Sequence, residues 1–435
     1  MDSILRWEVC MKKSKIDMTI KIMIAVVLGV GFGVGFGDIA GSTKFIGDIF
    51  LRLIQMSIPL LVFGQIIEAV ARLNPKELKG FGAKTLVVFV LSSMLASAFG
   101  VLMALIFKPG SGVNIEGFGQ GTAIAAQNLS IKDTLLGFFP SNIIDSLAKG
   151  SIIQIILFAI FFGIALSQYM INKPSSKVLE VLTEFNEVII KLITIIMNVA
   201  PIGIFVLVAS TIGTLGLSVI IPLLKYLAVY GLATLLFLGL WILIVSVYCK
   251  FKPSRLISNM TEMSTMALAT TSSAITLPIA LEDSNHKLGI GPRITKLVLP
   301  LGMSLNSNGS AMHMAITVMT IAGIYGHVYS FSGLLYIIII ATLASLANAV
   351  VPGAGLVSLA IIVPQLGLPL ESIAIFAGVE WFVGMLRTIL NVTSDVFTAL
   401  IVAKGENEID YDIFYGRNST LTNKEVTEAP ETREK

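Results

Sequence analysis

Residues 297–323 read LVLPLGMSLNSNGSAMHMAITVMTIAG, a stretch that is apolar at both ends and polar in the middle. Its length and flanks suit a helix that crosses a bilayer, which needs about 20 apolar residues. Asn306, Ser307, Asn308 and Ser310 interrupt the apolar pattern at its midpoint. Because an unpaired backbone group in hydrocarbon costs several kcal/mol, a broken helix persists there only inside protein or beside a wet cavity. The stretch therefore predicts a discontinuous membrane helix that lines an internal site.

The composition of the whole chain supports a membrane protein. Of its 435 residues, 55% are hydrophobic and only 13% are charged, whereas soluble proteins carry about 25% charged residues. Long apolar runs recur at 19–37, 45–71, 84–107, 151–170, 185–210 and 218–248. Runs of this length predict spanning helices and an all-α polytopic fold. The net charge of +3 gives no indication of a nucleic-acid partner.

The positions of Lys and Arg predict the topology. Basic residues gather at 6–15, 72–84, 173–177 and 250–255, whereas the alternate loops at 37–44, 110–131 and 211–218 are nearly free of them. Cytoplasmic loops retain positive charge during insertion. We therefore expect a multi-pass protein of the plasma membrane, with a cytoplasmic N-terminus at 1–18 and a polar, solvated cytoplasmic tail at 404–435.

Several other motifs are assigned structural roles or are absent. The sequence GVGFGVGFG at 29–37 lacks the GxGxxG spacing of a nucleotide loop, and it favours close packing of two helices through small residues. Cys10 and Cys249 both fall near the expected cytoplasmic side, so a disulfide is not indicated. The chain has no HExxH, GxSxG or Walker motif, so we expect no enzymatic activity.

Beyond residue 253 two further apolar segments are interrupted by polar or helix-breaking clusters. These are TTSSAITLP at 270–278 and NAVVPGAG at 348–355. Three interruptions in one region suggest that they share one cavity. Discontinuous helices around a midplane site are the recurring device of secondary transporters, in which helix ends present backbone dipoles to ions and substrate.

The last span, expected at about 371–403, contains the charged residues. Arg387, Asn391 and Asp395 are spaced four residues apart, which places them on one helix face over about 12 Å. Charged side chains in a membrane helix are costly and are expected to face the protein interior. The alternative is a purely structural ion pair of Arg387 with Asp395 or Glu380. His313 could titrate in a proton-coupled cycle, but a lone histidine is more often a packing residue.

The order of the motifs resembles the dicarboxylate/amino acid:cation symporter family, which includes glutamate, C4-dicarboxylate and serine/threonine transporters. The resemblance covers about residues 19–414. It rests on MSIPLLVF at 56–63, APIGIF at 200–205, TTSSAITLP at 270–278, LPLGMSLNSNGSA at 299–311, VPGAG at 351–355 and RTILNVTSDVFTALIVAKGENEID at 387–410.

The resemblance implies a glutamate-transporter-like fold with eight transmembrane helices and two re-entrant helical hairpins, at about 256–283 and 332–368. It also implies scaffold and transport domains and a homotrimer. Helices 1–6, at 19–250, would form the scaffold and part of the transport domain. The transport core would occupy 251–403.

Transferred to this sequence, the family pattern assigns Arg387 to a carboxylate of the substrate, which its planar fork can bind in a bidentate manner. The other substrate residues would be Thr388, Asn391, Ser310 and Ser273, the backbone of Thr271, Val351 and Gly355, and the position of Gly384. One cation would be held by Asp395 with carbonyls of Gly302, Asn306 and Asn391. A second cation would use Ser304 and the backbone of Ser345, Leu346 and Asn348. In this assignment Gly309 permits the bend of the broken helix.

Three departures from the family pattern affect function. Ser307 and Asn308 stand where the family usually has Met and Asp, so a third cation site built from Asn308, Asn306, Ser92 and Ser93 lacks its charge. Gly384 stands where amino-acid-transporting members have an Asp that pairs with the substrate ammonium. An ammonium without a carboxylate in a desolvated pocket costs more than about 1–3 kcal/mol, which favours dicarboxylates. Glu380, one turn away, is the alternative partner of an amino group.

The sequence therefore predicts a sodium- or proton-coupled symporter of small organic anions that works by an elevator movement, with a C4-dicarboxylate as the favoured substrate. No cofactor other than the coupling ion is expected. The first alternative is a symporter of acidic or polar amino acids, such as glutamate or aspartate, serine or threonine, or cystine. The second alternative is a passive anion channel or facilitator.

Overall fold

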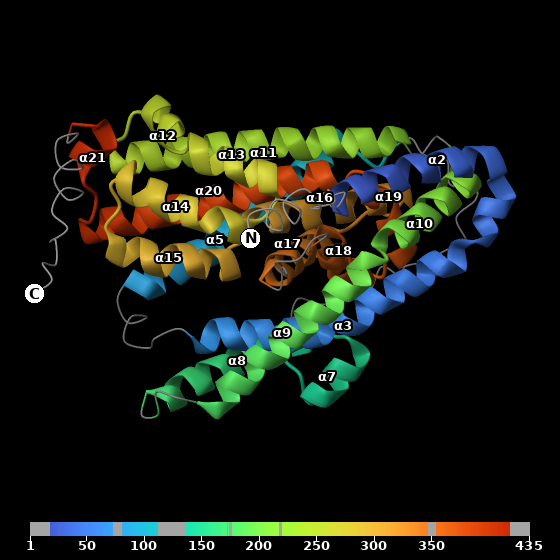
Figure 1. The fold of residues 1–435 in the computed structure, drawn as a ribbon, viewed down its shortest axis with the longest axis horizontal. Helices are drawn as coiled ribbons and strands as arrows, with labels where there is room; N and C mark the ends of the chain where they lie inside the picture. Colours follow the sequence, from blue (N-terminus) through green and yellow to red (C-terminus); the bar gives the residue numbers. More distant parts are fainter. Residues whose placement is uncertain are drawn as a thin grey trace, which may run out of the picture.

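The computed structural model describes residues 18–72, 81–111, 136–171, 173, 176–216, 220–346 and 354–417. Within these ranges the chain is helical apart from short connections and one isolated bridge between Ile290 and Ile409. In chain order (Figure 1), the elements are α2 Met18–Ser42, α3 Lys44–Ala71, α5 Ala83–Phe107, α7 Ile143–Lys149, α8 Ile152–Met170, α9 Lys177–Asn198, α10 Ala200–Leu215, α11 Ile220–Cys249, α12 Pro253–Asn259, α13 Thr261–Thr270, α14 Ser273–His286, α15 Pro292–Leu305, α16 Asn308–Ile324, α17 Phe331–Ser345, α18 Ala354–Gln365, η3 Leu370–Ser372, α19 Ile373–Ala377, α20 Glu380–Glu406 and α21 Tyr411–Tyr415.

The long apolar helices confirm the prediction of a polytopic all-α membrane protein. In the described ranges six helices are long and apolar enough to cross a bilayer, and a seventh span exists if α9 and α10, bent by 52° at their junction, count as one. The predicted runs at 45–71, 84–107 and 218–248 correspond to α3, α5 and α11. The predicted run at 185–210 is the bent pair.

Helices α2 and α10 lie side by side along one end of the molecule (Figure 1). Gly29 and Gly33 of α2 face α10, where an added Cβ would lie 2.8 Å from the carbonyl oxygen of Phe205 and 2.6 Å from that of Ala209. A side chain at either position would push the helices apart. The prediction that this glycine-rich run serves helix packing is therefore confirmed.

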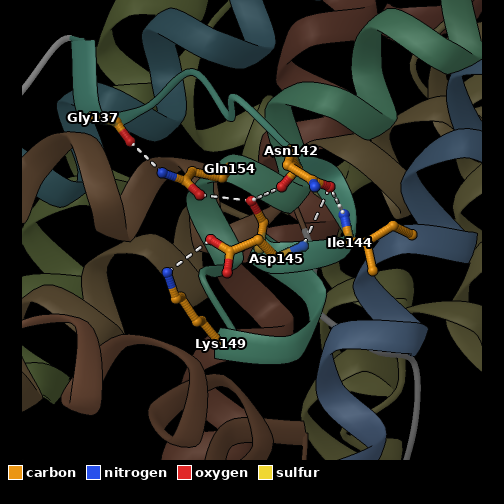
Figure 2. Close-up of polar contacts among 7 residues, drawn as sticks. Gly137, Asn142, Ile144, Asp145, Lys149 and Gln154 are labelled. Atoms are coloured by element: carbon orange, nitrogen blue, oxygen red, sulfur yellow. Dashed lines mark hydrogen bonds and ion pairs between the residues drawn. The ribbon is translucent and has the colours of Figure 1, made fainter.

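Helices α3, α8 and α9 pack together below the rest of the bundle (Figure 1). The short helix α7 precedes α8, and Asn142 caps it by accepting a hydrogen bond of 2.9 Å from the backbone N–H of Ile144 (Figure 2). At its other end the carbonyl of Gly150 accepts a bond of 3.2 Å from the amide of Gln365 in α18. Helix α7 thus joins this group of helices to the group that contains the broken helices.

The remaining helices surround α20, which packs against α5, α11, α13, α14, α15, α16 and α18. Two of the predicted interruptions lie within the described residues, and both are confirmed as helix breaks. Thr271 ends α13 with a left-handed φ of 50°, and Ser272 then caps α14. Between α15 and α16, Asn306 adopts extended backbone and Ser307 a non-helical conformation with φ of −126° and ψ of 63°. The third interruption falls largely at 347–353, outside the described residues.

Two sequence-based boundaries were wrong. The last span begins at Glu380, because residues 370–377 form the separate short elements η3 and α19. The expected solvated tail does not begin at Lys404, since α20 continues to Glu406 and α21 then packs back onto the bundle. Phe414 of α21 is fully buried and stacks on Phe251 with ring centroids 3.7 Å apart. Residues 418–435 lie outside the described part of the chain.

Candidate substrate and cation site

The polar stripe of α20 faces the interior of the bundle, as the sequence predicts. Arg387, Thr388, Asn391 and Asp395 are each between 4% and 6% exposed. Burying charged groups in a membrane helix is costly unless other groups compensate them. The question is therefore which groups on the neighbouring helices meet these side chains.

Arg387 is paired with Glu380, one of the two partners that sequence reasoning left open. Its Nη1 lies 3.0 Å from Oε1 of Glu380, and the two side chains are only 7% and 11% exposed. The same oxygen accepts a hydrogen bond of 3.0 Å from the backbone N–H of Gly355, in the first turn of α18. First-turn N–H groups lack partners inside their own helix and carry partial positive charge. A Cβ at Gly355 would collide with both charged groups, so only glycine permits this approach.

Asp395 interacts with the break between α15 and α16. The side-chain amide of Asn306 donates a hydrogen bond of 2.8 Å to Oδ1 of Asp395. Gly302, one turn earlier in α15, approaches so closely that an added Cβ would overlap the Asp395 side chain. The structure thus brings Asp395, Asn306 and Gly302 together, three of the residues expected at the first cation site.

Asn391 connects α20 to the start of α16. Its Oδ1 accepts a hydrogen bond of 2.8 Å from the backbone N–H of Gly309, and its Nδ2 lies 3.5 Å from Oγ of Ser310. The carbonyl of Gly309 accepts a bond of 3.0 Å from the Tyr230 hydroxyl on α11. Asn391 therefore lies between the expected anion and cation sites and contacts a predicted member of the substrate site.

The expected role of Gly309 was wrong. Gly309 lies inside α16 and is absent from the described glycines with positive φ, so it does not form the bend. The break is carried by Asn306 and Ser307, and the Asn306 side chain donates to Asp395 and accepts from the hydroxyls of Ser92 and Ser93. The absence of a side chain at Gly309 instead lets α16 rest on the backbone of α20.

We expect Gly309→Ala to destabilise the transporter. The new Cβ would lie 2.9 Å from Cα and C of Arg387, and backbone atoms cannot rotate away. Such overpacking costs about 1–3 kcal/mol, which would lower the thermal unfolding midpoint measured by fluorescence-detected size-exclusion chromatography. The control is Gly239→Ala in α11, where an added Cβ meets nothing within 4 Å. Equal midpoints for the two variants would contradict the packing role of Gly309.

The tip between α13 and α14 approaches the same region of α20. A Cβ at Gly384 would lie 3.7 Å from Cβ of Thr271 and 3.8 Å from Nη2 of Arg387. Gly384, Thr271 and Arg387 are therefore neighbours, as the family pattern implies. Ser273 is half-buried at the first position of α14. No carboxylate occupies the position of Gly384 beside the guanidinium.

The expected third cation site is a neutral hydrogen-bonded cluster. Oγ of Ser92 lies 3.2 Å from Oδ1 of both Asn306 and Asn308, and Oγ of Ser93 lies 2.9 Å from Oδ1 of Asn308. Nδ2 of Asn308 is buried and has no hydrogen-bond partner among the described residues. The four residues do converge, but all four are neutral. The nearest charge is that of Asp395, which is hydrogen-bonded to Asn306.

The residues expected at the second cation site are only partly described. The Ser304 hydroxyl is exposed and donates to the carbonyl of Pro300, and the buried Ser345 hydroxyl donates to the carbonyl of Thr342. Both hydroxyls are therefore engaged within their own helices. Leu346 follows Ser345 at the end of α17. Asn348 and Val351 lie outside the described residues.

The donor set suits a hard cation. Asp395 offers carboxylate oxygens, and the backbone carbonyls expected from Gly302, Asn306 and Asn391 are oxygen ligands too, the type that hard cations prefer. Within the described ranges no three His, Cys, Asp or Glu side chains are grouped as a transition metal would require.

Two contacts of this site were not predicted from the sequence: the hydrogen bond from the N–H of Gly355 to Glu380, and the hydrogen bond from the Tyr230 hydroxyl to the carbonyl of Gly309. The glycine of the VPGAG motif is the only local signal for the first contact, and no local pattern indicates the second.

A guanidinium and a carboxylate buried beside broken helices, in a bundle of apolar spans, define a membrane transporter rather than an enzyme. The family model of the sodium:dicarboxylate symporter family matches residues 18–405. The chain therefore belongs to the sodium:dicarboxylate symporter family. This finding confirms the resemblance inferred from the motifs.

The similar proteins divide between two kinds of substrate. The proton/glutamate-aspartate symporter of Escherichia coli (strain K12) is 32% identical over 84% of this chain and 85% of its own length. The proton/sodium-glutamate symport protein of Bacillus caldotenax is 30% identical over 85% of this chain and 89% of its own. C4-dicarboxylate transport protein 1 of Ralstonia nicotianae (strain ATCC BAA-1114 / GMI1000) is 30% identical over 86% and 88%, respectively.

Proposed function

We propose that this protein is a cation-coupled symporter whose substrate is a C4-dicarboxylate. The observation that carries the choice of substrate is Gly384, which lies beside Arg387 and Thr271 without a carboxylate to receive an ammonium group. Arg387 supplies a planar fork for one carboxylate. Ser310, Thr388 and Asn391, all of them buried, would complete the substrate pocket as the family pattern implies. Some similar proteins are named C4-dicarboxylate transport proteins.

The cation site centres on Asp395 and uses sodium or a proton as the coupling ion. Asn391 connects the two sites, because its side chain meets Gly309 and Ser310 while its own backbone is an expected cation ligand. A cation offsets the charge of the anion, so the loaded site crosses apolar surroundings that would reject either charge alone. Coupling between the two sites is then reciprocal by thermodynamic linkage.

The proposed transport cycle is an elevator movement in a homotrimer of the plasma membrane. Each subunit has eight spans and two re-entrant hairpins, formed by α13 with α14 and by α17 with α18, and both termini are cytoplasmic. Helices α5 and α11 and the helices from α13 to α20 form the moving transport domain, and α2, α3 and α7 to α10 form the scaffold. This division is supported by the packing of α5 and α11 against α16 and α20.

The second candidate function is symport of glutamate or aspartate. It is favoured by Glu380, a buried carboxylate in the site that could receive an ammonium, and by the names of several similar proteins. Glu380 already pairs with Arg387, however, so an ammonium would have to compete with the guanidinium. We therefore rank this function below dicarboxylate symport.

The test is uptake of labelled succinate, fumarate, aspartate and serine into proteoliposomes, with sodium and pH gradients imposed separately. We expect gradient-dependent uptake of succinate and fumarate at rates about 5- to 150-fold above aspartate, since one unpaired buried ammonium costs about 1–3 kcal/mol. Faster uptake of aspartate than of succinate would make the amino-acid function correct. Uptake that never exceeds equilibration under any gradient would indicate a facilitator.

A further inference from the structure

Glu380 pairs with the guanidinium of Arg387, which is the group that the proposed function assigns to a substrate carboxylate. Glu380 and substrate would therefore compete for Arg387. Glu380 Oε1 lies 3.0 Å from Nη1 of Arg387 and is also held by the N–H of Gly355. Its other oxygen, Oε2, is buried and has no hydrogen-bond partner among the residues that the structure describes. Among the described residues, only one of the two carboxylate oxygens of Glu380 is therefore hydrogen-bonded.

Binding of an anion changes the charge balance of this pocket. In the state described, the charges of Glu380 and Arg387 cancel. When a substrate carboxylate also approaches Arg387, two negative groups share one positive group in a buried site. An uncompensated buried charge is costly, and carboxyl groups that share one site avoid the cost by binding a proton. One proton on Glu380 restores the balance between Arg387 and that one carboxylate.

The neighbouring elements offer few other acceptors for that proton. From α11 the pair is faced by Tyr226 and Tyr230, and from α16 Arg387 is faced by His313. The Tyr230 hydroxyl already donates to Gly309, and the Tyr226 hydroxyl lies 3.0 Å from Oγ1 of Thr317. Helix α18 contributes the N–H of Gly355. His313 is fully buried, with neither ring nitrogen bonded within the described ranges, so it is one rival proton site, and the carboxylate of Asp395 in the proposed cation site is the other.

We propose that Glu380 is the proton-binding group of the transport cycle, a role that rests on the proposed symport function. Without substrate, ionised Glu380 neutralises Arg387. When substrate binds, the ion pair of Glu380 with Arg387 breaks, an ion pair of substrate with Arg387 forms, and one proton from the same aqueous side binds Glu380. On the other side substrate leaves, the proton leaves Glu380, and the internal pair forms again.

The test compares the wild type with Glu380→Gln in proteoliposomes that contain a trapped pH-sensitive dye. Fumarate at about pH 7.5 carries no proton itself, so acidification of the lumen during its uptake reports protons moved by the protein. We expect about one proton per fumarate in the wild type and less than about one-tenth of that in Glu380→Gln, because an amide cannot titrate. The ratio of protons to substrate does not depend on how far the variant slows transport.

Two further variants keep the outcome decisive. Glu380→Asp retains a carboxyl group and should retain proton movement, and it replaces Glu380→Gln as the informative variant if the latter does not fold. His313→Phe should leave the ratio unchanged. Loss of proton movement in His313→Phe, or its persistence in Glu380→Gln, would overturn the proposal.

The wild type alone separates the two levels of inference. Sodium-driven fumarate uptake without proton movement would leave the proposed function standing and would refute the role of Glu380. Absence of all substrate uptake would instead refute the proposed function. If Glu380→Gln loses aspartate uptake but still moves protons with fumarate, Glu380 binds an ammonium and the proposal is wrong.

Discussion

Arg387→Ala is expected to abolish uptake of succinate and fumarate. Removing one partner of a buried charge pair costs about 2–5 kcal/mol, which corresponds to a loss of about 30-fold or more in uptake at low substrate concentration. The physical reason is that no other cation faces Gly355, Glu380 and Gly384 among the described residues of the pocket. The measurement is the initial rate of uptake into proteoliposomes.

The single substitution also leaves Glu380 buried without its partner, so stability has to be controlled. The double variant Arg387→Ala with Glu380→Gln removes both charges, and we expect it to be at least as stable as Arg387→Ala and still inactive. Arg293→Ala is the matched control, because Arg293, at the start of α15, is 63% exposed and pairs with Glu408, which follows α20. Exposed pairs contribute little to stability. Normal uptake by the folded double variant would refute the assignment of Arg387 to substrate.

Asp395→Asn is expected to have the second large effect, on coupling. An amide can still hydrogen-bond to Asn306, but it lacks the negative charge that a cation requires. Losing a buried charge–charge interaction of about 2–5 kcal/mol should raise the cation concentration for half-maximal uptake at least about 30-fold. The measurement is uptake of succinate as a function of external sodium and of pH.

The matched control for this variant is Ser394→Ala, one residue away on α20. Ser394 is fully buried, and its hydroxyl donates a bond of 2.6 Å to the carbonyl of Leu390 in its own helix. We expect it to retain the cation dependence of the wild type. If Asp395→Asn retains it as well, the cation lies elsewhere, and the neutral cluster of Asn308, Ser92 and Ser93 becomes the next candidate.

The breaks that build the site could be predicted from the sequence because they are local. Asn306 and Ser307 are polar residues inside an apolar run, and the structure breaks the helix at these two residues. The same holds for Thr271 and Ser272 between α13 and α14. In each case the chemistry that ends the helix lies within a few residues of the break.

The partner of Arg387 could not be predicted from the same kind of information. Glu380 and Asp395 lie seven and eight residues from Arg387 on the same helix, so spacing alone did not distinguish them. The choice depends on other helices. Asn306 of α15 binds Asp395, whereas the N-terminus of α18 holds Glu380 next to the guanidinium.

The segment at 404–417 was predicted wrongly for a similar reason. Residues 404–417 are polar enough to suggest a solvated tail, yet Phe414 stacks on Phe251 and its carbonyl accepts a bond of 3.1 Å from the Asn259 amide. Both partners are distant in sequence, between α11 and the end of α12. Local composition does not contain such contacts, so only the assembled fold reveals that this segment is packed.

The most direct measurement of the central claim is the steady-state ratio of internal to external succinate in proteoliposomes of the wild-type protein. If one buried site loads the anion together with a cation, the ratio rises above one when an inward sodium or proton gradient is imposed, and it returns to one when an ionophore dissipates that gradient. A ratio that stays at one under both gradients, while succinate still equilibrates, would contradict the coupling of the anion and cation sites.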